Sequence, residues 1–277
     1  MQAPRHWRRF ARDRWALTGF ALVTILAVLA LTAPWIAPAD PLHGSLAVSL
    51  RAPSRVFWLG TDVQGRDVLS RVLYGARLSL LVGLVSQTVA GVLGVGLGLA
   101  AGYYGRWVDA SIMRLADVTL AFPSLLLLIA IAAAVNPSLP VVFVVIGLVG
   151  WAGVARVVRG EVLGLRSREY VLAARALGAS DARVLARHLL PGVLPPVIVI
   201  TTLGVGGAIM AEAALSFVGL GARPPTPSWG AMVADGRDLL RVAPWVSLVP
   251  GVAIGLAVLG VNLVGDGLRD ALEVRAA

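Results

Sequence analysis

Long stretches without a charged residue dominate this sequence and limit what it can fold into. Residues 15–39, 78–105, 118–155, 189–211 and 242–265 contain no Asp, Glu, Lys or Arg. A helix needs roughly 20 mostly apolar residues to cross the hydrocarbon core of a bilayer. Of the 277 residues, 58% are hydrophobic and only 14% are charged, whereas a typical soluble domain has roughly 25% charged residues. We therefore predict an all-α, polytopic membrane helix bundle.

The third stretch is too long for one span. Asn136-Pro137-Ser138-Leu139-Pro140 interrupts it, and proline ends helices and biases the preceding residue toward extended geometry. We expect helices near Val118–Val135 and Val141–Val158, which gives about six transmembrane helices. In the first stretch Trp15 and Trp35 are separated by about 30 Å of helix and are expected to lie at opposite membrane interfaces.

The first stretch has a second interpretation, a cleaved signal peptide. An arginine-rich start precedes an apolar run, and Ala37-Pro38-Ala39 resembles a cleavage site. The run is longer than the roughly 7–15 residues of a signal core, so an uncleaved anchor is favoured.

Arginine distribution predicts the orientation. Segments 1–15, 102–117, 156–190 and 266–277 contain 16 of the 24 arginines. Cytoplasmic loops are enriched in basic residues, so we expect both termini to be cytoplasmic. The charge of +9 is explained in this way rather than by nucleic-acid binding, because no basic soluble domain is present.

The residue types exclude several kinds of site. The chain has no cysteine, no lysine and only three histidines, which share no spacing. Disulfides and thiolate metal sites are excluded, and no two-histidine metal site is readable. A phosphate-binding loop needs a lysine, so we expect ATP hydrolysis to take place on a partner. We predict no catalytic residue, no metal site and no cofactor bound by this chain.

Small residues repeat every four positions in the second stretch, at Ser86, Ala90, Gly94, Gly98 and Gly102. Such a row lets another helix backbone approach closely in lipid. Two interpretations stand: a subunit interface or sliding helix, and ordinary internal packing.

One acidic residue, Glu212, lies near the outer end of the fifth span. Acids within spans mark pathways or ion pairs. We expect Glu212 either to line a pathway or to pair with an arginine such as Arg237 or Arg241, and the ion pair is favoured. The scarcity of such acids argues against a proton-coupled secondary transporter.

Two outer segments are too long for simple turns. In residues 40–77, Leu69, Val72, Leu73 and Ala76 recur at helical spacing, which predicts an amphipathic helix at the outer interface. Residues 216–243 are rich in glycine and proline and are expected to form a stiff segment on the outer face.

Cytoplasmic residues 165–196 are expected to form a helix–turn–helix outside the membrane. Gly178 suits a left-handed helix end, Ser180 suits the cap of the next helix, and Pro191 is expected to stop that helix. Leu172, Ala173, Ala176 and Leu177 supply apolar contacts between arginines. The segment is interpreted either as a docking element or as an ordinary basic loop.

This segment resembles the "EAA–glycine" loop of bacterial ATP-binding-cassette (ABC) importer permeases, at Ala173, Ala174, Gly178 and Leu190-Pro191. The resemblance implies a coupling helix that sits in a cleft of the ATPase subunit. The glutamate that names the motif is Leu172 here, and Glu169 is the candidate replacement. The residues expected to couple to the ATPase are Glu169, Tyr170, Leu172, Ala173, Ala174, Arg175, Gly178, Ala179 and Pro191.

The resemblance extends over nearly the whole chain, to the second or "C-type" permease of the dipeptide/oligopeptide/nickel group. It is carried by Gly60-Thr61-Asp62, Gly65-Arg66-Asp67-Val68, Tyr74-Gly75-Ala76-Arg77, Ala101-Gly102-Tyr103-Tyr104-Gly105, Ala121-Phe122-Pro123-Ser124, the segments 211–217 and 224–230, and Asn262-Leu263-Val264-Gly265-Asp266 with the residues that follow it. It implies the type I ABC importer permease fold in the bacterial inner membrane. It also implies a heterodimer with a homologous permease, two ATPase subunits that bind ATP and Mg, and an extracytoplasmic substrate-binding protein.

Peptides are the leading cargo, and nickel or a nickel chelate is the alternative. A secondary transporter or channel is the alternative of a different class. We divide the chain into residues 1–77, with the first span and the amphipathic segment, and residues 78–277, the core permease domain with the coupling loop 160–191.

Overall fold

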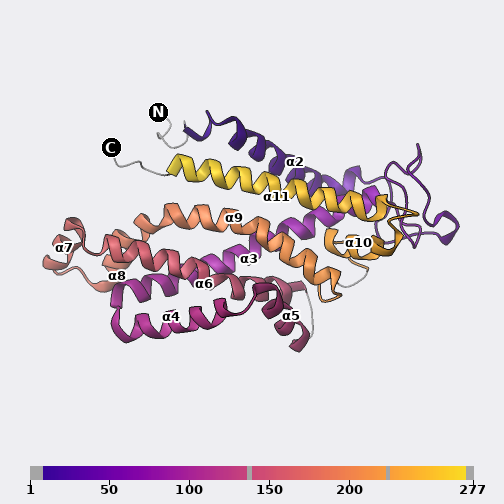
Figure 1. Ribbon diagram of the computed structural model, residues 1–277. Coiled ribbons are helices and arrows are strands. Elements are labelled where there is room, and N and C mark those ends of the chain that lie inside the picture. The colour runs from indigo at the N-terminus through magenta and orange to yellow at the C-terminus, as the bar shows by residue number, and fades with distance from the viewer. Residues whose placement is uncertain (1–8, 136–138, 223–224, 273–277) are drawn as a thin grey trace.

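The computed structural model describes residues 9–135, 139–222 and 225–272. Long helices run alongside one another, with α7 at one end of the bundle and α10 with the loop 37–67 at the other (Figure 1). The α-helices are α2 (Arg14–Ile36), α3 (Val68–Tyr104), α4 (Arg106–Ala121), α5 (Ser124–Ala134), α6 (Leu139–Leu165), α7 (Glu169–Ala176), α8 (Asp181–Val184), α9 (Leu190–Phe217), α10 (Trp229–Gly236) and α11 (Trp245–Leu272). Short η elements are η1 (Leu46–Val48), the π-helix η2 (Leu185–Leu189) and η3 (Arg237–Leu239).

The membrane-spanning helices agree with the prediction of about six. Among the described residues, five helices are long and apolar enough to cross a bilayer, namely α2, α3, α6, the continuous run Asp181–Phe217 and α11. The pair α4 and α5 passes the same test together but is bent by 93°, so the number is six if this pair is one span. The described residues contain one isolated β-bridge, between Thr61 and Asp67, and the all-α prediction is confirmed.

The single helix expected near residues 118–135 is wrong. Helix α4 ends at Ala121, and α5 begins at Ser124 after a sharp bend. Phe122, the residue before Pro123, is extended with φ −89° and ψ 140°, because a following proline disfavours helical geometry. Of the break expected at residues 136–140, residues 136–138 lie outside the described part of the chain.

The separate amphipathic helix expected around Leu69–Ala76 is also wrong. These residues are the first turns of α3, whose N-cap is Asp67. The Asp67 carboxylate accepts hydrogen bonds from the backbone N–H and the hydroxyl of Ser70, both at 2.7 Å. Leu73 and Ala76 are buried within the protein. The division at residue 77 stays a prediction, and this position lies inside α3.

The row of small residues on α3 packs against α6. Gly94, Gly98 and Gly102 face a row of valines on that helix: Val154, Val158 and Val162. A Cβ at Gly94 would lie 2.5 Å from the Val154 Cβ, and one at Gly98 would lie 2.7 Å from the Val158 Cβ. Ala90 is fully buried, and the Ser86 hydroxyl donates to the Phe143 carbonyl at 3.0 Å. The contacts favour the interpretation of internal packing.

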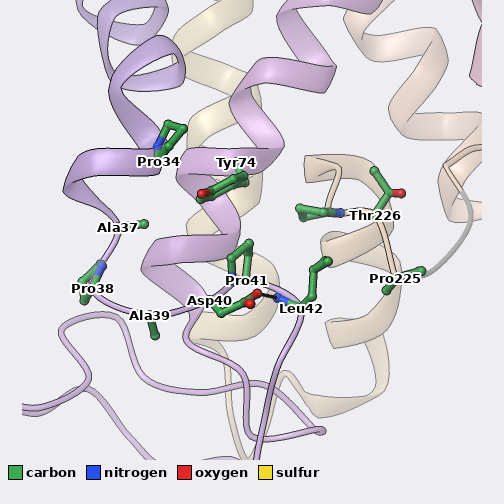
Figure 2. A pocket seen from close by; sticks show the side chains of 11 residues that line it. Pro34, Ala37, Pro38, Ala39, Asp40, Pro41, Leu42, Tyr74, Pro225 and Thr226 are labelled. Atoms are coloured by element: carbon green, nitrogen blue, oxygen red, sulfur yellow. Dashed lines mark hydrogen bonds between the residues drawn. The ribbon is translucent and has the colours of Figure 1, made fainter.

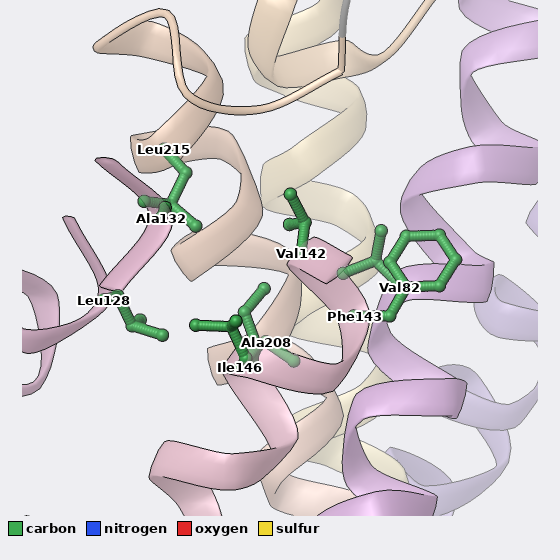
Figure 3. Packing of buried hydrophobic residues seen from close by; sticks show 9 residues of the cluster. Val82, Leu128, Ala132, Val142, Phe143, Ile146, Ala208 and Leu215 are labelled. Atoms are coloured by element: carbon green, nitrogen blue, oxygen red, sulfur yellow. The ribbon is translucent and has the colours of Figure 1, made fainter. Parts of the chain in front are cut away.

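Helix α5 turns its apolar face into a cluster with α3, α6 and α9. Figure 3 shows Leu128 and Ala132 of α5 beside Ile146 of α6 and Ala208 and Leu215 of α9. On the other side of the bundle α2 packs on α11, where Gly19 lies against Leu263 and the Gly260 carbonyl. Trp15 and Trp35, at the two ends of α2, are 72% and 80% exposed, as expected of interfacial anchors.

Candidate functional site

Helix α7 projects from the bundle at the end where α2 begins and α11 ends (Figure 1). It connects to α6 through residues 166–168 and to α8 through residues 177–180. Gly178 has φ +80°, the left-handed geometry that we predicted for the end of this helix. A left-handed residue lets the chain reverse after a helix, and glycine adopts this geometry without steric cost.

An apolar anchor holds α7 on the bundle. Val171 is fully buried in a cluster with Val162 of α6 and with Val184 and Leu189 from the following segment. Leu172 and Leu177 on other faces of the segment are 50% and 89% exposed. Val171 therefore fixes the segment to the bundle, while the face with Leu172 and Leu177 stays exposed.

Polar contacts tie the same segment to the end of α3. The Tyr103 hydroxyl lies 2.6 Å from Asp181 Oδ1, and the Arg175 guanidinium lies 5.8 Å from the centre of the Tyr103 ring, within the range of a cation–π contact. Arg166 Nη1 donates to the Gly102 carbonyl at 3.0 Å. Sequence reasoning missed Tyr103 as a support of α7, since 70 residues or more separate it from Arg175 and Asp181.

Pro191 does not stop the second helix, and this prediction is wrong. The run Asp181–Phe217 is continuous, through α8, the π-turn η2 and α9, with Pro191 in the first turn of α9. Pro191 has no N–H to donate, and the π-helix that directly precedes it changes the hydrogen-bond pattern, since the Leu190 N–H donates to the Leu185 carbonyl. Ser180 occupies the N-cap position of α8, but its side chain makes no capping bond.

Residues 94–277 match the family described as the binding-protein-dependent transport system inner membrane component, and residues 4–53 match the N-terminal TM domain of oligopeptide transport permease C. The chain belongs to this family of ABC importer permeases. The dipeptide transport system permease protein of Alkalihalophilus pseudofirmus is 45% identical over 267 residues, which cover 96% of this chain and 88% of the relative. The glutathione transport system permease proteins of Escherichia coli and Shigella sonnei are each 44% identical over 276 residues, which cover 99% of this chain and 91% of the relative.

The permease is thus a multi-pass inner-membrane component of the oligopeptide/dipeptide C type that works with other ABC components. Because the chain belongs to this family, the alternative of a secondary transporter or channel is set aside. The residues that we expected to couple to an ATPase are brought together on one projecting segment, apart from Pro191, which lies at the start of α9. Glu169 is exposed in the first turn of α7 and forms no ion pair with a described residue.

Glu212 of the permease is 1% exposed. Its Oε1 accepts a hydrogen bond from the Ser216 hydroxyl at 2.6 Å, and its Oε2 has no hydrogen-bond partner among the described residues. No ion pair joins Glu212 to a described arginine, so the pair expected with Arg237 or Arg241 is wrong. Arg237 instead lies 3.4 Å from Asp238 and over the Phe217 ring, and the described ion pairs do not include Arg241. A role of Glu212 in the pathway stays a prediction.

A buried ionic cluster organises the opposite end of the permease. The Asp62 carboxylate lies 2.7 Å from Arg66 Nε and 3.4 Å from Arg71 Nε, and all three residues are less than 9% exposed. Asp235 of α10 lies 4.0 Å from Arg66 Nη2. Burial raises the pKa of Asp235, and Arg71 and Arg66 oppose that rise. The cluster joins the loop 37–67, α3 and α10, although 173 residues separate Asp62 from Asp235.

A cavity of about 660 Å³ lies beside this cluster, between the end of α2, residues 37–42, Tyr74 of α3 and residues 225–227 (Figure 2). Prolines and Tyr74 make up much of its lining. Asp40 at its edge accepts from the Leu42 N–H at 2.8 Å and contacts His43 Nδ1 at 2.7 Å. These two contacts, the Leu42 bond first, lower the pKa of Asp40.

Proposed function

We propose that this permease and a homologous permease form the pathway by which di- and oligopeptides enter the cell. Two ATPase subunits would bind ATP and Mg and supply the energy, and an extracytoplasmic binding protein would deliver the peptide. The observation that carries the proposal is the α7 segment, an exposed helix that a buried valine and a tyrosine hold at the end of the bundle.

The surface of α7 suits a partner with an apolar cleft. Tyr170, Leu172 and Leu177 are 47%, 50% and 89% exposed, and apolar side chains at this density indicate a protein contact. Arg168 and Arg175 are also exposed, so an acidic rim on the partner would complement the segment. Glu169 would then pair with a basic group of the partner and take the role of the motif glutamate, whose position is occupied by Leu172.

Continuity of the helix gives a route from the ATPase to the membrane. The run Asp181–Phe217 has no break, so a displacement of α7 and α8 would move α9 with it. A cleft that binds α7 differently in the open and closed ATPase dimers would shift the permease between inward-open and outward-open forms, because only differential binding moves an equilibrium. This route requires α7 and both termini to be cytoplasmic, as the arginine distribution predicts.

Peptides are favoured over nickel as the cargo. The relatives are named for a dipeptide and for glutathione, and both of these molecules contain peptide bonds. A transport assay decides the point. The complete importer, reconstituted in vesicles, is expected to accumulate labelled dipeptide in an ATP-dependent manner. Uptake of nickel without uptake of any peptide would refute this assignment.

The coupling role is tested by site-directed cross-linking. The chain has no cysteine, so single cysteines report one position each. Leu177→Cys is expected to cross-link to the ATPase subunit in membranes of cells that contain the complete importer. Leu46→Cys, which replaces a side chain that is 79% exposed at the other end of the bundle, is the matched control and is expected to give no such product. Cross-linking from Leu46→Cys alone would reverse the proposed orientation.

A further inference from the structure

A groove between α3 and α9 lies about halfway along these two helices. Gln87 is the twentieth of the 37 residues of α3, so about 26–28 Å of helix extends on either side of it. Thr201 is similarly central in the run Asp181–Phe217. The groove has a volume of about 330 Å³, near the lower end of the roughly 300–1,000 Å³ of ligand pockets.

Four uncharged polar side chains line this groove: Gln87, Thr88, Thr201 and Thr202. Its other lining residues are apolar, and no charged residue contributes to it. The three threonine hydroxyls donate to carbonyls of their own helices, for example Thr202 to Ile198 at 2.7 Å. The hydroxyl oxygens can still accept a hydrogen bond, while their hydrogens are already used.

Gln87 differs from the threonines because its carboxamide has no hydrogen bond with any described residue. Its side chain lies on α9 at Gly204, where a Cβ would overlap Oε1. The glycine therefore makes room for the amide, and the amide opens onto the groove. The Gln87 side chain is partly exposed, so its amide is accessible to a ligand with both a donor and an acceptor, which would form hydrogen bonds with its two polar atoms.

We propose that the Gln87 carboxamide binds the main chain of the peptide during its passage, donating from Nε2 to a peptide carbonyl and accepting a peptide N–H at Oε1. Each non-proline residue inside an extended peptide presents its own main-chain N–H and C=O on the same side, and this pair of groups does not depend on the side chain. An uncharged groove neither selects for nor traps a particular side-chain charge. This inference rests on the proposed function and assigns a place in the chain to its substrate.

The first test measures whether the groove faces water. Thr88 is exposed on the groove, and Thr88→Cys in the complete importer is expected to react with a membrane-impermeant methanethiosulfonate from at least one side of the membrane. Val28→Cys on α2, which replaces a side chain that is 51% exposed in the middle of a span, is the lipid-facing control and is expected to stay unreactive. An unreactive Thr88→Cys in every nucleotide state would overturn the proposal, because the groove would then be covered by lipid or by the second permease.

The second test removes the proposed hydrogen bond in two ways, by a change in the peptide and by a change in the protein. Uptake of alanyl-alanine and of its analogue methylated at the peptide nitrogen is compared in wild type and in Gln87→Leu. The wild type is expected to prefer the unmethylated peptide by about three- to tenfold more than the variant does, as one hydrogen bond predicts. Any preference that arises in the binding protein cancels in this ratio.

Thr202→Val, with Thr32→Val as the control for a hydroxyl bonded in the same way on α2, separates groove effects from general effects of a lost hydroxyl. Only Thr202→Val is expected to lower uptake. An equal ratio for the two peptides in wild type and Gln87→Leu would overturn the proposal. Absence of any peptide uptake by the wild type would instead refute the proposed function, and the Thr88→Cys result would still report on the groove.

Discussion

Replacing Gly178 by valine is expected to uncouple the permease from its ATPase. Gly178 has φ +80°, and a Cβ at this position would meet no atom within 4 Å. The substitution therefore causes no clash, and its whole cost comes from the backbone. A residue with a Cβ costs about 1–2 kcal/mol in left-handed geometry, which lowers the equilibrium constant for the correctly ended α7 by roughly 5- to 30-fold at 1.4 kcal/mol for each factor of ten.

The assay is the number of peptides transported per ATP hydrolysed by the importer in vesicles, together with the affinity of the ATPase for the permease. Both are expected to fall in Gly178→Val, by at most about this 5- to 30-fold. Gly178→Asn is expected to lose much less, because asparagine tolerates left-handed geometry. Gly164→Val is the matched control, since Gly164 also has open space around it but an ordinary helical φ.

Wild-type coupling and affinity in Gly178→Val would refute the reasoning, because the geometry of the α7 end would then have no part in docking. Equal losses in Gly178→Val and Gly164→Val would refute it as well, since the left-handed φ would not be the cause.

Three further outcomes follow from the packing of the bundle. Asp62→Ala is expected to lower the free energy of unfolding by about 3–5 kcal/mol, because it leaves two buried arginines without their shared partner. Asp238→Ala, at an exposed pair, is the control and is expected to cost under about 1 kcal/mol. Thermal unfolding in detergent measures both variants, and similar losses would contradict the burial argument. Gly98→Leu is expected to prevent α3 from packing on α6 and to lower the yield of folded protein, whereas Gly96→Leu, where a Cβ meets nothing within 4 Å, keeps the wild-type yield. Glu212→Gln is expected to be neutral or to stabilise by up to about 1 kcal/mol, because it keeps an acceptor for Ser216 and replaces the oxygen that has no partner among the described residues. A large loss of stability on thermal unfolding would indicate that the carboxylate itself is required.

Local chemistry explains what could be predicted from the sequence. The charge-free stretches locate the spans because a bilayer excludes charge, whatever the tertiary arrangement. Gly178 was predicted as a helix end because only a residue without a Cβ adopts left-handed geometry at no cost. The row of small residues on α3 indicated close helix packing because small side chains let another helix approach. It did not reveal that the valines of α6 pack against this row.

Two prolines, each preceded by a large apolar residue, show the limit of such reasoning. Pro123 separates α4 from α5 at a bend of 93°, whereas Pro191 lies inside a continuous helical run. A proline removes the same donor in both places. At Pro191 the fully buried Leu189 and Val193 hold the two sides of the helix in one cluster, so packing outweighs the local preference.

The sequence by itself therefore determined the membrane class, the approximate spans, the shape of the α7 end and the family resemblance. Only the tertiary structure decided which partner each polar group finds. Asp62 meets Arg71, Tyr103 meets Asp181, and one oxygen of Glu212 meets no described partner. The physical reason is that propensity and hydropathy act between neighbours in the chain, whereas hydrogen bonds and ion pairs depend on distances that only the packed helices set.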